Sequence, residues 1–178
     1  MKNILSKVIL ASVVAGTTLS LRAADQTPLS ENLKPLKSYL GNWSVRWTEE
    51  NGQSMAGKAT LKPDAGGNIV TFRIETQDKD GKPVFSRVSV FFWQTETKSL
   101  AEVNFDSNGL RCSNVLVSQT DDKLVWQGHA FSPDGKPSWG STETVKKDEN
   151  TWTGQYVRMS FGGAPMPDGP KATFTRAK

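Results

Sequence analysis

The sequence predicts an all-β protein: a single antiparallel up-and-down β-barrel of about ten strands, with a short N-terminal helix. From Trp43 to the C-terminus, apolar and polar residues alternate with a period of two, which is typical of half-buried strands. Turn-forming pairs such as Asn51-Gly52 and Asp80-Gly81 separate the apolar runs. No segment has the length and helical period of a crossover helix, so the pattern disfavours a parallel sheet.

The first 23 residues are expected to form a secretory signal peptide, outside the barrel. Lys2 and Lys7 precede an apolar run over 8–14, and Ala23 offers a cleavage point. The alternative is a membrane anchor, but the run is shorter than the roughly 20 apolar residues that a spanning helix needs. We therefore expect an exported protein, periplasmic or secreted, with no membrane span in the mature chain. The expected organisation is a signal peptide at 1–23, a tether at 24–32 and a lipocalin-like barrel domain at 33–178.

The basic character of the chain comes largely from this leader. The full sequence has a net charge of +4, and removal of Lys2, Lys7 and Arg22 leaves +1. Nucleic-acid binding usually requires a basic stripe, which the mature chain lacks. The sequence therefore predicts no nucleic-acid partner.

The two residue types that most often hold metals are rare in this chain. Cys112 is the only cysteine and His129 the only histidine. An internal disulfide, a cysteine-based zinc site and a multi-histidine metal site are therefore excluded. We expect Cys112 to be a small buried apolar residue.

A short helix is expected before the first strand, over 31–40. Leu33, Leu36 and Leu40 stand at helical spacing, and Pro35 limits the helix to a turn or two. Such a helix is expected to act as a lid on the barrel.

The remaining chain is expected to form strands, because each run has one apolar side. In the clearest run, Val70, Phe72 and Ile74 share one face and polar residues occupy the other. Short turns join the runs, so each strand is expected to pair with the next. The ten expected strands are 43–47, 55–61, 70–74, 84–92, 101–105, 115–117, 124–126, 138–145, 151–161 and 171–176.

The longest irregular segment lies at 162–170 and contains three prolines and three glycines. Regular pairing is not expected there, because proline has no backbone donor. We expect this segment to cross the surface, either as a flap over one mouth of the barrel or as a stiff connector.

A short helical turn followed by Gly41-Asn42-Trp43 resembles the Gly-x-Trp opening motif of lipocalins and their barrel relatives. The chain from Leu33 onward resembles a bacterial exported family with a lipocalin-like, calycin-type β-barrel of unknown function. The resemblance implies that Trp43 closes the barrel floor under a basic residue from near the last strand, for which Arg176 is the candidate. The strand number is nearer that of the fatty-acid-binding and haem-binding relatives. The resemblance implies a fold and no activity.

A barrel of this size is either filled by its own side chains or holds a small ligand. We expect a small apolar or amphipathic ligand in the interior, lined by the apolar strand faces. The alternative is that these residues fill the core and the barrel serves as a structural or protein-interaction module. The residues expected to line the cavity are Trp47, Phe72, Ile74, Val90, Phe92, Val103, Phe105, Leu116 and Trp126.

Four arginines lie within expected strands: Arg73, Arg87, Arg111 and Arg158. An inward-facing arginine would need an anionic partner, such as a ligand carboxylate, because an unpaired buried charge is costly. The other expectation is that all four lie on the solvated outer face.

Chemical activity has no positive signal in this sequence. A nucleophile elbow, a phosphate loop and a dinucleotide fingerprint are all missing. We expect no catalytic residues, no metal site and no cofactor. By analogy with the haem-binding relatives, His129 is the one residue that could serve as an axial haem ligand. The alternative is that His129 is a surface histidine.

Overall fold

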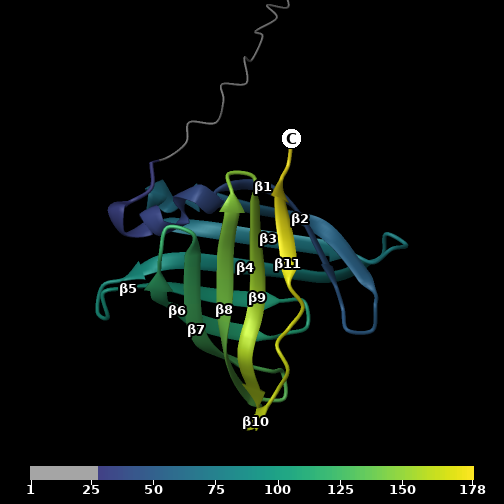
Figure 1. Ribbon diagram of the computed structural model, residues 1–178. Helices are drawn as coiled ribbons and strands as arrows, with labels where there is room; N and C mark the ends of the chain where they lie inside the picture. The colour runs from purple at the N-terminus through teal and green to yellow at the C-terminus, as the bar shows by residue number, and fades with distance from the viewer. Residues whose placement is uncertain (1–27) are drawn as a thin grey trace, which may run out of the picture.

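The computed structural model describes residues 28–178 (Figure 1). The expected signal peptide at 1–23 lies outside the described residues, as do residues 24–27 of the expected tether. The last part of that tether packs onto the barrel, where the Ser30 N–H donates to the carbonyl of Gly67 at 3.0 Å.

Residues 28–178 form two short 3₁₀ helices and eleven strands. The helices are η1 (Glu31–Tyr39) and η2 (Ala65–Gly67). The strands are β1 (Gly41–Thr48), β2 (Ser54–Asp64), β3 (Ile69–Gln77), β4 (Pro83–Gln94), β5 (Ser99–Asp106), β6 (Arg111–Gln119), β7 (Lys123–Phe131), β8 (Pro137–Asp148), β9 (Thr151–Phe161), β10 (Ala164–Pro165) and β11 (Ala172–Arg176).

Ten strands close into one antiparallel barrel, which confirms the predicted fold class. From β1 to β9 each strand pairs with the next along the chain. β11 then closes the ring between β9 and β1, with Trp43 opposite Arg176 and Phe174 opposite Trp152. In the part of the chain that the structure describes, no helix is long and apolar enough to cross a membrane.

The last strand of the barrel is interrupted. β10 and β11 both pair with β9, and the irregular segment 162–170 runs beside β9 between them. The Met166 N–H donates to the carbonyl of Met159, and the Gly169 N–H donates to the carbonyl of Tyr156, each at 2.9 Å. The segment is therefore part of the barrel wall, and the expected flap is wrong.

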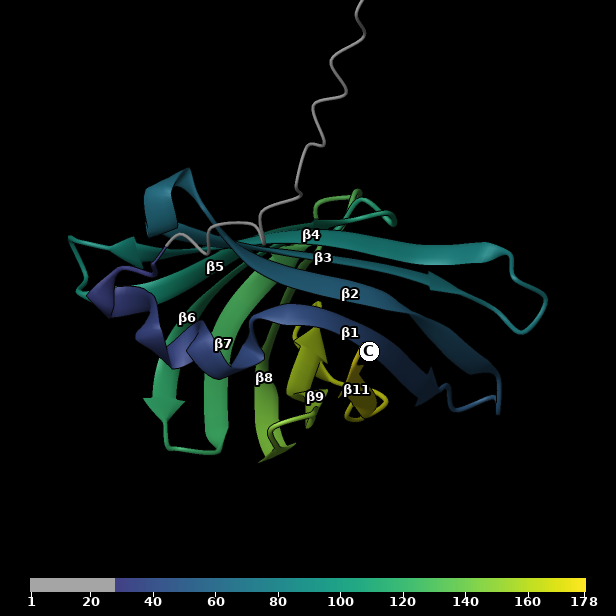
Figure 2. The same ribbon diagram turned by 90° about the horizontal axis from the view of Figure 1, so that it is seen from above.

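Helix η1 lies across one end of the barrel (Figure 2). Leu33, Leu36 and Tyr39 point into the barrel and are almost completely buried. The helix contacts β3 and β4, and Pro35 lies within it. The expected lid is thus present, wound as a 3₁₀ helix, and it closes the end of the barrel where β1 begins.

Candidate ligand-binding cavity

The barrel encloses a cavity of about 470 Å³, bounded by η1 at one end. Ligand sites in proteins usually measure 300–1,000 Å³, so this volume suits a small molecule. Apolar side chains form most of the wall, and a smaller polar group lies on one side. The cavity runs from Leu36 and Tyr39 of η1 toward Glu49 and Asn108 in loops at the other end of the barrel.

The apolar part of the wall is built from packed aromatic rings. Trp152 stacks on Phe174 with ring centres 3.6 Å apart and planes 4° from parallel. Trp152 also meets Trp43 and Tyr39 edge-on, at 5.9 Å and 5.6 Å. Such contacts add to burial of the rings and hold them in fixed positions. This part of the wall is therefore rigid.

The Gly-x-Trp residues form the floor of the barrel, which is the same end that η1 closes. The Trp43 ring is buried, and its Nε1–H donates to the carbonyl of Tyr39 at 2.8 Å. Arg176 lies over this ring, with Cζ 4.3 Å from the ring centre, and donates to the carbonyl of Leu40 at 3.0 Å. Gly41 has a φ of +128°, and a Cβ there would lie 2.7 Å from Nη1 of Arg176. The first position of the motif must therefore be glycine for the arginine to reach the tryptophan.

Four of the nine expected lining residues do line the cavity: Trp47, Phe72, Ile74 and Trp126. They lie on β1, β3 and β7, where one strand face is clearly more apolar than the other. Leu116 packs against the core cluster from β6 but does not line the cavity.

The other four expected lining residues, Val90, Phe92, Val103 and Phe105, do not line the cavity, and this expectation is wrong. Their neighbours Ser89 and Asn104 are fully buried, at 0% and 2% exposure. Successive side chains of a strand point to opposite faces, so Val90, Phe92, Val103 and Phe105 lie on the outward faces of β4 and β5. Phe105 is 55% exposed.

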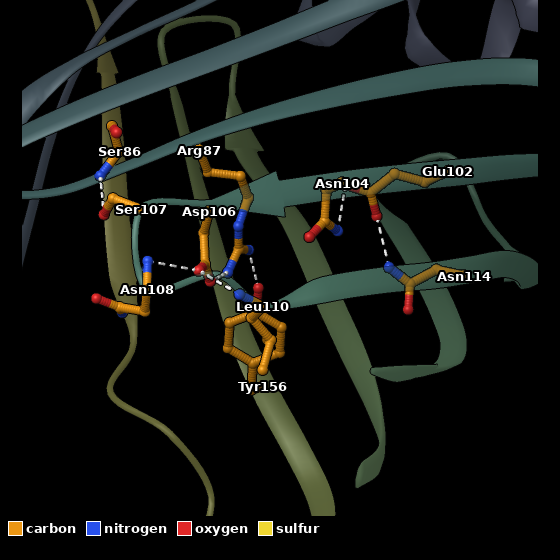
Figure 3. A network of polar contacts seen from close by, with 10 residues as sticks. All are labelled: Ser86, Arg87, Glu102, Asn104, Asp106, Ser107, Asn108, Leu110, Asn114 and Tyr156. Carbon is orange, nitrogen blue, oxygen red and sulfur yellow. Dashed lines mark hydrogen bonds and ion pairs between the residues drawn. The ribbon is translucent and has the colours of Figure 1, made fainter. Parts of the chain in front are cut away.

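The inward face of β5 carries Glu102, Asn104 and Asp106 instead, whereas that of β4 carries Arg87 and Ser89 between the aromatic residues Phe85 and Phe91. Arg87 Nη1 donates to the Tyr156 hydroxyl, and Nη2 lies 3.5 Å from Oδ2 of Asp106 (Figure 3). The side chains of Arg87 and Asp106 are 15% and 4% exposed. The arginine that faces inward thus pairs with a carboxylate of the barrel itself. Asp106 also accepts the backbone N–H groups of Asn108 and Leu110, at 2.9 Å and 3.1 Å.

A second carboxylate lies next to this pair. Glu102 accepts hydrogen bonds from the amide nitrogens of Asn104, at 3.1 Å, and Asn114, at 2.8 Å. Figure 3 shows Glu102 between these two amides. Both partners are uncharged, so Glu102 has no cation bonded to it.

Burial changes the titration of several groups around the cavity. Burial, and to a smaller extent the charge of Asp122, raises the pKa of the Tyr39 phenol to about 12. Burial also raises the pKa of Tyr156, and the Arg87 guanidinium opposes this rise. Burial would lower the pKa of Arg87, but its neighbours, Tyr156 first, outweigh it and raise that pKa. Both phenols are therefore neutral and Arg87 is charged at neutral pH.

The two residues most often used in reactive sites lie away from the cavity lining. His129 pairs across the sheet with Trp139, and its ring lies 5.3 Å from that exposed ring, on the outer face of the barrel. It cannot ligate a group held in the cavity. Cys112 is buried, as expected, and burial raises the pKa of its thiol to about 11.

The sequence interpretation missed Glu102, Asp106 and Tyr156. One signal could have found the first two: β5 reads as alternating apolar and polar residues, so either face could point inward. Pairing across the sheet resolves this, because Arg87 is opposite Asp106 in the β4–β5 register. Tyr156 carries no such signal.

Comparisons with known proteins agree with this architecture. No family model matches the sequence, and no curated protein matches it. The solved structure of Rv2717c from M. tuberculosis is similar, with a TM-score of 0.65 and 18% identity over 85% of this chain and 100% of that chain. This likeness shows the fold alone: the chain is a ten-stranded antiparallel β-barrel.

Two designed barrels also match. A de novo designed fluorescence-activating β-barrel has a TM-score of 0.40 and 14% identity, over 83% of this chain and 100% of its own. A redesigned barrel bound to DFHBI has a TM-score of 0.40 and 15% identity, with the same coverage. Likenesses this distant carry no argument about what this chain binds.

Proposed function

We propose that this protein binds a small amphipathic molecule inside its barrel, as an exported carrier or binding protein. The observation that carries the proposal is the cavity of about 470 Å³ with an apolar wall and a polar group on one side. Binding sites for small molecules typically combine such walls with a few placed polar groups. Membership of an exported lipocalin-like family is part of the same proposal.

Uptake of prodan, a neutral naphthalene fluorophore, tests the cavity. Gly154 lines the cavity, and a Cβ there would meet only Trp152 and Phe174, at 3.6 Å and 3.7 Å. Gly154→Phe therefore fills the space that a ligand would occupy. We expect it to weaken prodan binding at least about tenfold. Thr153→Phe, one residue earlier and on the opposite strand face, is the matched control and should bind prodan normally.

A second candidate function rests on the outer face of the barrel. Trp139, Phe105 and Phe161 are 59%, 55% and 38% exposed, and a protein-interaction module would present such residues. The same titration separates the two candidates. Prodan bound at the outer face would be lost in Trp139→Ser and retained in Gly154→Phe. That result would contradict the cavity proposal.

Export is tested by fractionation and intact mass. When the full chain is expressed in a bacterium with an outer membrane, we expect the periplasmic protein to begin at Ala24. Full-length protein confined to the cytoplasm would contradict export.

A further inference from the structure

We propose that the cavity selects ligands with a cationic amine at the polar end, with Glu102 as the counter-charge, and discriminates against carboxylates. This inference rests on the proposed function and names its ligand class. It depends on the charges around the cavity, on the partners that each already has, and on which hydrogen-bonding atoms are left.

The charged side chains that line the cavity have a negative balance. Among residues 28–178 they are Arg87, Glu49 and Glu102, one cation against two anions. Asp106 is not one of the lining residues, and it already pairs with Arg87. The positive charge of Arg87 is therefore compensated inside the protein, and the two lining carboxylates are in excess. An anionic ligand in this space would be repelled by these carboxylates.

Arg87 is held in a way that leaves little for a ligand carboxylate. Its guanidinium donates to Tyr156 and faces Asp106, and its Cζ lies 5.2 Å and 5.5 Å from the rings of Phe85 and Tyr156. The two-pronged contact that makes arginine a good carboxylate receptor needs two free parallel N–H groups. Only Nε of this side chain is buried and without a partner in the described chain. A ligand carboxylate would therefore have to bind beside Asp106 and share the guanidinium with it, and the charge of Asp106 would oppose this.

Glu102 presents the opposite case. Its partners Asn104 and Asn114 are neutral amides, so its negative charge is solvated by hydrogen bonds but not neutralised. The Asn104 amide must turn its nitrogen to Glu102, because a carboxylate only accepts. Its oxygen is then left over, and Oδ1 of Asn104 has no partner within the described residues although the residue is only 2% exposed. In Figure 3 this oxygen points away from Glu102.

The polar group next to Glu102 is therefore rich in acceptors. A primary ammonium has three N–H donors and one positive charge, which match the free lone pairs of Glu102 and the local charge. The apolar body of such a ligand would lie against Trp126 and Phe72, and aromatic walls also attract cations. Among the described residues, Nε–H of Arg87 and Nε1–H of Trp152 are buried donors without a partner, and an ammonium does not satisfy them. The preference for an amine therefore rests on charge, because Glu49 and Glu102 outnumber Arg87 among the charged side chains that line the cavity.

Displacement of prodan by three ligands of equal chain length tests this inference. Octylamine, octanol and octanoate differ at neutral pH only in a positive, neutral or negative head. We expect octylamine to bind at least about tenfold more tightly than octanoate, with octanol between them. In Glu102→Gln this preference should shrink to within about threefold. Glu75→Gln removes an exposed carboxylate on β3 and is the charge-matched control, which should keep the preference.

The outcomes separate the two proposals. If prodan and octanol do not bind inside the barrel, the proposed function fails. If octanol binds and octanoate binds as tightly as octylamine or more tightly, the inference is overturned and the proposed function stands. An unchanged preference in Glu102→Gln would also overturn the role of Glu102. If that variant does not fold, the ligand series on the unaltered protein still decides the ligand class.

Discussion

The barrel interior beside η1 and the interior beside β5 are stabilised by different forces. Near η1, Trp43, Trp152 and Phe174 are buried and packed ring against ring. Beside β5, the side chains of Arg87 and Asp106 are 15% and 4% exposed and are held by pairing. Burial of apolar area stabilises the first region, whereas the second depends on every charged group keeping its partner. The comparison teaches that one barrel interior can combine a packed apolar core with a paired polar group.

The largest effect is expected from a loss of volume in the apolar region. Trp43→Ala removes a ring that is 2% exposed and leaves a cavity among Trp152, Tyr39 and Arg176. We expect the free energy of unfolding to fall by about 3–5 kcal/mol, measured by urea titration. Trp139→Ala, at a ring that is 59% exposed, is the control and should change it by less than about 1 kcal/mol. Equal effects of the two variants would contradict the assignment of the floor to Trp43.

A smaller effect is expected from the loss of one charge in the polar region. Arg87→Met leaves Asp106 without its cation, although Asp106 keeps two backbone N–H bonds. We expect a loss of about 2–3 kcal/mol of unfolding free energy. The double variant Arg87→Met with Asp106→Asn should be less destabilised than the sum of the single variants, because the orphaned charge is gone. Strict additivity would show that the pair contributes nothing through its charges.

The difference between the two regions also explains what could be read from the sequence. In β3, one face of the strand is apolar and the other is polar: the first carries Val70, Phe72 and Ile74, and the second carries Thr71, Arg73 and Glu75. Only the apolar face can point inward, and the prediction for this strand was right. The feature that makes a strand predictable is the difference in polarity between its two faces. The Gly-x-Trp motif and the alternating runs carry such contrasts, so fold class, strand number and lid helix were predictable.

In β5 the contrast points the wrong way, and in β4 both faces carry apolar residues. Val103 and Phe105 form the apolar face of β5, yet Asn104 and Asp106 point inward. A prediction from the strand pattern places the apolar face inside, because burial of polar groups is costly unless they are paired. Here they are paired: Asp106 with Arg87 on β4, and Glu102 with Asn104 on β5 and with Asn114 on β6. The contacts with Arg87 and Asn114 join different strands and are invisible in any single strand, and that is why the polar part of the candidate site could not be predicted.

The smallest effect compares one residue type in the two regions. Tyr39 lies in the apolar region and Tyr156 beside Arg87, and burial raises the pKa of both phenols, that of Tyr39 from 10.0 to about 12. A raised pKa means that the folded protein holds the phenolic proton more tightly than the unfolded chain. The resulting stability is complete below pH 10, and it is lost as the pH rises through 12. Alkaline stability should therefore decline over this interval.

Tyr39→Phe should reduce this decline by an amount on the order of 1–2 kcal/mol, because phenylalanine has no proton to lose. Urea titrations of both proteins at several alkaline pH values, with tyrosinate absorbance recorded in parallel, measure the effect. Tyr156→Phe should also reduce the decline, because burial raises the pKa of that phenol and the Arg87 guanidinium opposes only part of the rise. A pH dependence that neither substitution changes would contradict the raised pKa values of the two phenols, and with them the burial of both hydroxyl groups.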